Sequence, residues 1–135
     1  MNKKIIKITG ILIFVVIIGF GVFYLTNILP ANRVLEEVRN AEIKDIDLGK
    51  VADGRYVGEF SYSRTNCKVE VIIRDHRIEG INVLENGTSA YAKKAEGVIG
   101  RVIELNKTNV DVVSGATTTS KALLKAVEAA LSSGL

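Results

Sequence analysis

Residues 55–84 read RYVGEFSYSRTNCKVEVIIRDHRIEGINVL, and their side chains alternate in the manner of β-strands. In residues 55–62 the aromatic side chains fall on one face, and in residues 67–74 every second position is Cys, Val or Ile. Residues 78–84 resume the pattern after Asp75-His76. A period of two is typical of half-buried strands, and a short polar pair between such runs is typical of a hairpin turn. We therefore predict three consecutive antiparallel strands, with His76 as a turn residue.

The spacing changes to that of helices after the third strand. Apolar residues recur at intervals of three and four over residues 95–103, which predicts one amphipathic helix that ends at residues 106–109. Residues 110–113 fit a short apolar strand or extended piece, and residues 118–131 fit a second helix. The resulting order, β-β-β-α-β-α, predicts an α+β fold in which two helices cover one face of a small antiparallel sheet.

A long apolar segment precedes this domain. No charged residue occurs from Ile8 to Asn32, and residues 8–29 are long enough to cross a hydrocarbon core of about 30 Å as a helix. A cleavable signal peptide is the alternative, but its apolar region is shorter and residues 29–32 offer no convincing small-x-small cleavage site. We therefore predict one transmembrane helix that contacts the lipid bilayer through residues 8–29.

The charges near this segment indicate its orientation. Lys3, Lys4 and Lys7 lie against its first edge, and the positive-inside rule places such a cluster in the cytoplasm. Arg33, Arg39 and Lys44 follow the segment and weaken the asymmetry. The predicted organisation is a single-pass membrane protein with an extracytoplasmic C-terminal domain, in this order: cytoplasmic tail 1–7, transmembrane helix 8–29, stalk or linker 30–50, domain 51–135.

Composition excludes several functional classes. Lys and Arg number 18 against 15 Asp and Glu, so no broad cationic surface is available for nucleic acid. A single cysteine and a single histidine cannot form an internal disulfide or a cysteine-built metal cluster, and they make a protein-ligated haem or zinc site improbable. Cys67 is expected to be a small core residue. Any redox chemistry therefore requires an organic cofactor.

Residues 111–120, DVVSGATTTS, carry the strongest functional signal. They lie where the extended piece meets the second helix, and the free N–H groups of a first helical turn bind anions. The simpler alternative is that Thr118, Thr119 or Ser120 only caps the helix. A nucleotide phosphate-binding loop is rejected because the glycine that should precede Lys121 is missing.

This segment resembles the flavinylation motif of the FMN-binding domain family, which includes the C subunit of the sodium-pumping NADH:quinone reductase and the G subunit of Rnf complexes. The motif is Asp, two variable residues, Ser or Thr, Gly, Ala and Thr, and it is complete at residues 111–117. The resemblance extends to Asp53–Gly58, to the hairpin over residues 68–84, and to Ser120–Leu123. It covers roughly the last eighty residues and excludes the apolar segment and the stalk.

The resemblance implies that Thr117 carries FMN through a phosphoester bond. A separate flavin transferase, dependent on FAD and magnesium, would install it, because a threonine hydroxyl needs an external base and metal to attack a phosphoryl group. Asp111 and Ser114 would serve recognition or loop shape, and Gly115 and Ala116 would keep the approach open. The expected cofactor-binding residues are Asp111, Ser114, Gly115, Ala116, Thr117 and Thr118.

The expected function is that of a membrane-anchored flavoprotein that transfers electrons between membrane or surface redox proteins. The chain lacks the long insertions of the respiratory-complex subunits it resembles, which favours a stand-alone carrier or a component of extracellular electron transfer over membership in such a complex. A stand-alone enzyme acting on an organic substrate is less expected, because the small domain offers little surface to bury a flavin ring. A covalent bond would prevent loss of the flavin outside the cell. Two alternatives remain: a domain that binds FMN without a bond, and a non-redox interaction domain whose loop only caps a helix.

Overall fold

The structure is a computed structural model that describes residues 2–135, and its contacts divide the chain into two units, one up to Val34 and one from Leu35 to Leu135. Helix α1 (Lys3–Phe23) of the first unit continues through a π-helical segment (Tyr24–Ile28) into helix α2 (Leu29–Arg39), whose residues from Leu35 onward belong to the second unit. Within the described residues, this is the one helix long and apolar enough to cross a membrane. Its apolar side chains are exposed, as in Phe20 at 69%.

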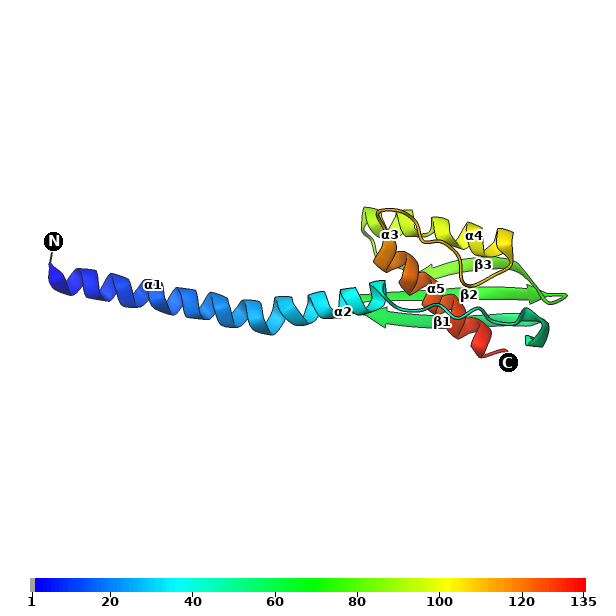
Figure 1. Ribbon diagram of the computed structural model, residues 1–135, viewed down its shortest axis with the longest axis horizontal. Coiled ribbons are helices and arrows are strands. Elements are labelled where there is room, and N and C mark those ends of the chain that lie inside the picture. The colour runs from blue at the N-terminus through cyan, green and yellow to red at the C-terminus, as the bar shows by residue number, and fades with distance from the viewer. Residues whose placement is uncertain (1) are drawn as a thin grey trace. The chain divides into compact units, whose positions relative to one another are not determined.

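The second unit contains the predicted sheet (Figure 1). Strands β1 (Gly54–Tyr62), β2 (Thr65–Arg74) and β3 (Arg77–Glu85) are antiparallel in the order β1-β2-β3. Asp75 and His76 form the second turn with φ of 51° and 58°, the left-handed conformation that a two-residue hairpin of type I′ requires at both positions. The predictions for the three strands and for the turn are confirmed.

The helices lie over one face of this sheet (Figure 1). Helix α5 (Thr117–Ser132) packs across β1 and β2, and its apolar residues are buried as predicted, including Leu123, Val127 and Leu131. Gly58 makes this packing possible, because a Cβ there would overlap Ala126 O and Ala130 N. The α+β fold is therefore confirmed, with the core between the inward strand face and α5.

The single helix of three to four turns that was predicted to follow the third strand and to end at residues 106–109 is instead two helices, α3 (Ala90–Ala95) and α4 (Gly97–Leu105). They are separated at Glu96, whose N–H donates to Lys93 O while its carbonyl accepts from Ile99 N, both at i to i+3 spacing. This tight local bonding, followed by glycine at Gly97, interrupts a regular α-helix. Three helices rather than two accompany the sheet.

The prediction of a fourth strand at residues 110–113 is wrong, and only its alternative, an extended piece, holds. The backbone N–H and C=O groups that would pair with a neighbouring strand are instead hydrogen-bonded to side chains of α4 and α5. Arg101 Nη1 donates to Asp111 O and Val112 O at 2.7 and 2.9 Å, and Val113 N donates to Ser120 Oγ at 3.2 Å. These side chains replace a sheet partner.

The segment expected to be a stalk belongs largely to the compact unit, which begins at Leu35 rather than at Val51. Val38 of α2, Ile43 of the following loop and Leu48 of a short 3₁₀ helix (Leu48–Lys50) are each less than a tenth exposed and join the core. Burial of these apolar side chains favours attachment of the segment to the domain. We call residues 35–47 the strap.

Candidate functional site

The loop that precedes α5, residues 110–116, is held from both sides by side chains. Arg101 of α4 binds its carbonyls, and Ser120 of α5 accepts from Val113 N. Ala116 N donates to Val113 O at 3.0 Å, which closes a turn whose third residue, Gly115, has φ of +79°. A residue with a Cβ is strained at such an angle, so glycine is required here. The loop thus has a fixed shape without belonging to the sheet.

Helix α5 starts at Thr117 without a side-chain cap. Ala116 is the N-cap, with φ −136° and ψ 39°, and it has no side-chain hydrogen bond to offer. The prediction that Thr118, Thr119 or Ser120 caps the helix is wrong. Thr119 Oγ1 instead lies 3.2 Å from the Tyr62 hydroxyl in the core, and Ser120 Oγ serves the loop. The first-turn N–H groups are therefore free to bind an anion.

Two hollows flank Thr117. The larger, of about 610 Å³, is within the usual size range of ligand sites. Its lining residues are Arg39, Val112, Ser114, Gly115, Thr117 and Thr118. The smaller, of about 290 Å³, is more apolar, and it is lined by Leu35, Tyr62, Ser89, Tyr91 and residues 115–119. Gly115, Thr117 and Thr118 line both hollows. We call residues 115–118, the turn at Gly115 and the start of α5, the ridge.

The charge around this ridge is positive. Lys94 Nζ lies 3.3 Å from the point that a Cβ of Gly115 would occupy, and Arg39 lines the larger hollow. Lys94 makes no ion pair with any residue that the structure describes. Two cations beside free N–H groups favour a phosphate or another anion.

The structure brings most of the predicted site residues together. Ser114, Gly115, Thr117 and Thr118 line the larger hollow, and Ala116, which is largely buried, lines the smaller one. Asp111 does not line either hollow. Its carboxylate is exposed and has no hydrogen-bond partner among residues 2–135, so it is available to an external protein.

Sequence reasoning missed Leu35 and Arg39. Both were assigned to the stalk, and neither belongs to a recognisable motif. One signal was present: they are four residues apart, so they share a face of the helix that continues the apolar segment. Tyr91 also lines the smaller hollow, and at 66% exposed it is not a core residue.

The other chemically notable residues lie outside both hollows. Burial, with a smaller contribution from Glu85, raises the pKa of the Cys67 thiol to about 11, so it stays protonated at neutral pH. Its role as a core residue is confirmed. His76 Nδ1 lies 3.3 Å from both Leu48 O and Val51 O, as part of the turn. No cluster of three metal-ligating side chains occurs in the part of the chain that the structure describes.

Comparison with known proteins points to the same loop. The model of a family described as FMN-binding domain matches residues 63–132, which include the turn at Gly115 and the whole of α5. An uncharacterized protein of Treponema pallidum (strain Nichols) is 33% identical over 95 residues, or 69% of this chain. The chain spans 26% of the length of that relative.

Proposed function

The chain belongs to the FMN-binding domain family, with FMN as its cofactor, and from this premise we propose that it carries FMN covalently on Thr117 as a membrane-anchored electron carrier. The observation that carries the proposal is the uncapped start of α5, where Thr117 stands first in the helix beside two cations. A helix start that lacks a capping side chain leaves its N–H groups to a ligand.

The residues present fit a flavin phosphate. The N–H groups of the first turn and the positive end of the helix dipole suit a phosphoryl group. Gly115 has no side chain to obstruct it, and Lys94 and Arg39 supply opposite charge nearby. The more apolar hollow, with Leu35 and Tyr91, suits one part of an isoalloxazine ring.

Thr117 acts in attachment as an acceptor, and the reaction needs a partner. Its Oγ1 would form a bond to the FMN phosphorus of FAD, the pyrophosphate P–O bond would break, and AMP would leave. The domain supplies no base at hand, since Asp111 does not line either hollow and no other carboxylate does so. We therefore assign the base and the magnesium ion to a separate flavin transferase, for which the exposed Asp111 and Ser114 are contact points.

The helix of the first unit supports a membrane anchor. Its exposed apolar surface has no partner within the described residues, and its length suits a bilayer. With Lys3, Lys4 and Lys7 on the cytoplasmic side, the domain would lie outside the cytoplasm. A covalent bond has a physical purpose there, because a dissociated flavin would be lost by dilution.

The role in electron transfer follows from the openness of the site. FMN supplies one- and two-electron chemistry when bound. Thr117 would hold it by one end, while shallow hollows leave the other end open to a second protein. Membrane or surface redox proteins are the partners that this arrangement suits, in preference to an organic substrate that would need an enclosed pocket.

The test is flavinylation of the full chain in membranes of a host with an active flavin transferase. We expect in-gel flavin fluorescence for the wild type and for Thr118→Val, and none for Thr117→Val, which keeps the shape of threonine without its hydroxyl. Trypsin cleaves after Lys107 and Lys121, so mass spectrometry should place one FMN on the peptide 108–121. An unmodified Thr117 in the wild type would refute the covalent bond.

Acid precipitation separates the alternatives. A covalent flavin stays in the pellet, a non-covalent flavin moves to the supernatant, and a non-redox interaction domain gives no flavin in either fraction.

Membrane topology is tested by cysteine labelling. A cysteine placed at exposed Glu59 should react with a membrane-impermeant maleimide on intact cells, while the wild-type chain, with only the buried Cys67, gives the background. Labelling only after lysis would contradict an extracytoplasmic domain.

A further inference from the structure

We propose that Arg39 is a binding residue for the FMN phosphate on Thr117, and that Lys121 positions it by holding the strap against α5. This inference rests on the proposed function and adds to the site a segment that lies outside the family match, which begins at residue 63. It assigns to the strap a direct part in holding the cofactor.

Arg39 is placed for this role. It lines the larger hollow together with Ser114, Thr117 and Thr118. Its one ion pair within the described residues is with Glu36, at 3.9 Å, and the two side chains are 58% and 65% exposed. Such an exposed, long pair stabilises little and leaves the guanidinium available. A planar guanidinium can donate two parallel hydrogen bonds to phosphate oxygens, which makes arginine well suited to this anion.

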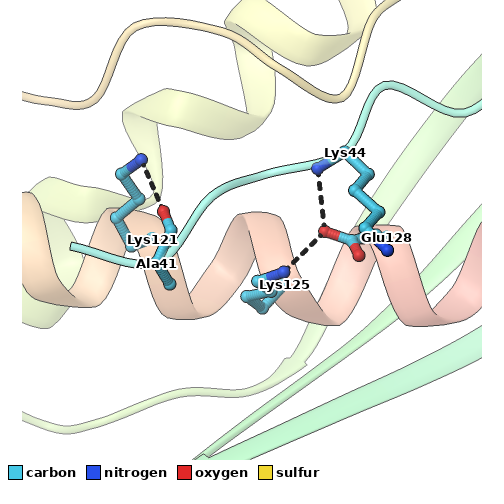
Figure 2. Close-up of polar contacts among 5 residues, drawn as sticks. All are labelled: Ala41, Lys44, Lys121, Lys125 and Glu128. Atoms are coloured by element: carbon cyan, nitrogen blue, oxygen red, sulfur yellow. Dashed lines mark hydrogen bonds and ion pairs between the residues drawn. The ribbon is translucent and has the colours of Figure 1, made fainter. Parts of the chain in front are cut away.

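The strap is fixed to α5 by polar contacts from Ala41 and Lys44 (Figure 2). Lys121 Nζ donates to Ala41 O at 2.9 Å, and Lys44 N donates to Glu128 Oε2 at 3.1 Å. Lys125 Nζ lies 3.0 Å from the same Glu128 oxygen, in a pair whose side chains are 21% and 15% exposed. These contacts join the strap to the helix that begins with Thr117.

The spacing of the contacts links Arg39 to Thr117. Lys121 is four residues after Thr117, so the two side chains share a face of α5. Ala41 is two residues after Arg39, and Val38, on the other side of Arg39, is buried in the core. The backbone around Arg39 is thus held on both sides, which limits the positions that its guanidinium can take relative to Thr117.

The chain offers matched controls. Arg33 carries the same charge six residues earlier but lines neither hollow. Lys44 resembles Lys121 in charge and lies in the strap, but its contact with Glu128 uses its backbone N–H, so its side chain is dispensable. Lys121→Arg retains a donor long enough to reach Ala41 O.

The experiment compares fully flavinylated full-length chains in detergent micelles by ³¹P NMR and by the gain in Tm on flavinylation. We expect Arg39→Gln to shift the phosphodiester resonance and to lose most of the Tm gain, while Arg33→Gln matches the wild type. We expect Lys121→Met to change the resonance and the Tm gain in the same direction as Arg39→Gln, but by less. Lys121→Arg and Lys44→Met should both give the wild-type resonance and Tm gain. A purely structural role for Lys121 would lower Tm equally with and without flavin and leave the resonance in place.

The outcomes separate this inference from the function on which it rests. A wild-type chain that takes up no flavin on Thr117 overturns both. A flavinylated wild type whose resonance and Tm gain equal those of Arg39→Gln overturns the role of Arg39 and leaves the covalent flavin intact. Equal values for Lys121→Met and the wild type overturn only the positioning by Lys121.

Discussion

Two regions of the domain, the sheet covered by α5 and the loop before α5, find partners for their backbone N–H and C=O groups in different ways. In the sheet, strand partners pair the backbone groups and apolar side chains alternate into the core. In residues 110–116, two side chains take over, Arg101 for the carbonyls and Ser120 for an N–H. The sheet is stabilised by a repeating ladder of backbone hydrogen bonds, and the loop by a few individual side-chain contacts. An individual contact can fix a shape while leaving one side open for a ligand.

The largest effect should come from Gly58→Val in the sheet. Its Cβ would overlap Ala126 O and Ala130 N, so α5 would have to move off β1, and we expect a loss of more than ~4 kcal/mol of unfolding free energy. Thermal unfolding followed by circular dichroism measures it. Gly80→Ala is the control, because its nearest neighbour would be Ile72 Cδ1 at 4.0 Å. Similar Tm values for the two variants would contradict the close packing of α5 on β1.

Gly115→Ala tests the loop in the same way. At φ +79° an alanine costs about 1–2 kcal/mol, which corresponds to roughly a fivefold to thirtyfold loss of the loop shape that the proposed transferase would recognise. Initial rates of flavin incorporation measure this loss. Gly100→Ala in α4, where a Cβ would meet nothing within 4 Å, should leave the rate unchanged and raise Tm slightly. A Gly115→Ala chain flavinylated at the wild-type rate would show that the flavin transferase does not depend on the shape of this turn.

Arg101→Met removes the clamp on the loop carbonyls. Two hydrogen bonds from a charged donor to exposed carbonyls should contribute about 1 kcal/mol, so we expect a small fall in Tm and a larger slowing of flavin incorporation. Arg77→Met, at the start of β3 and far from the loop in sequence, is the control for loss of charge. If flavin incorporation were unaffected while Tm fell, the clamp would serve stability alone.

The last effect lies in the sheet and is absent at neutral pH, because it appears only at high pH. Burial raises the pKa of Cys67 to about 11 from 9.0, so between pH 9 and 11 the unfolded chain releases a thiol proton that the folded chain keeps. Stability should therefore be independent of this group below pH 9 and fall as pH rises through 11. Chemical unfolding across this range measures the slope, and Cys67→Ala should remove it. An unchanged slope in Cys67→Ala would assign the dependence to other groups.

The comparison also explains which features the sequence could predict. Strands over residues 55–84 and the buried face of α5 follow from periodic side chains, which are a local signal. The extended piece at residues 110–113 was ambiguous because its apolar side chains suit a strand, whereas its actual partners are single side chains on two helices. Thr117 was identified by resemblance to a motif. Arg39 carried no motif, and only the folded strap brings it to the site.

Leu35 lies beside the ridge that carries Thr117, and it follows Leu29, the end of the predicted span, by six residues. Six residues reach at most about 20 Å even when fully extended. Given the proposed anchor at residues 8–29 and the proposed flavin on Thr117, this short connection would keep the flavin near the bilayer surface. The proposed carrier would then meet its partners by lateral diffusion along that surface, and a redox centre held far above the lipid would be out of range. The length of the connection between Leu29 and Leu35 would thus limit the partners by their height above the membrane.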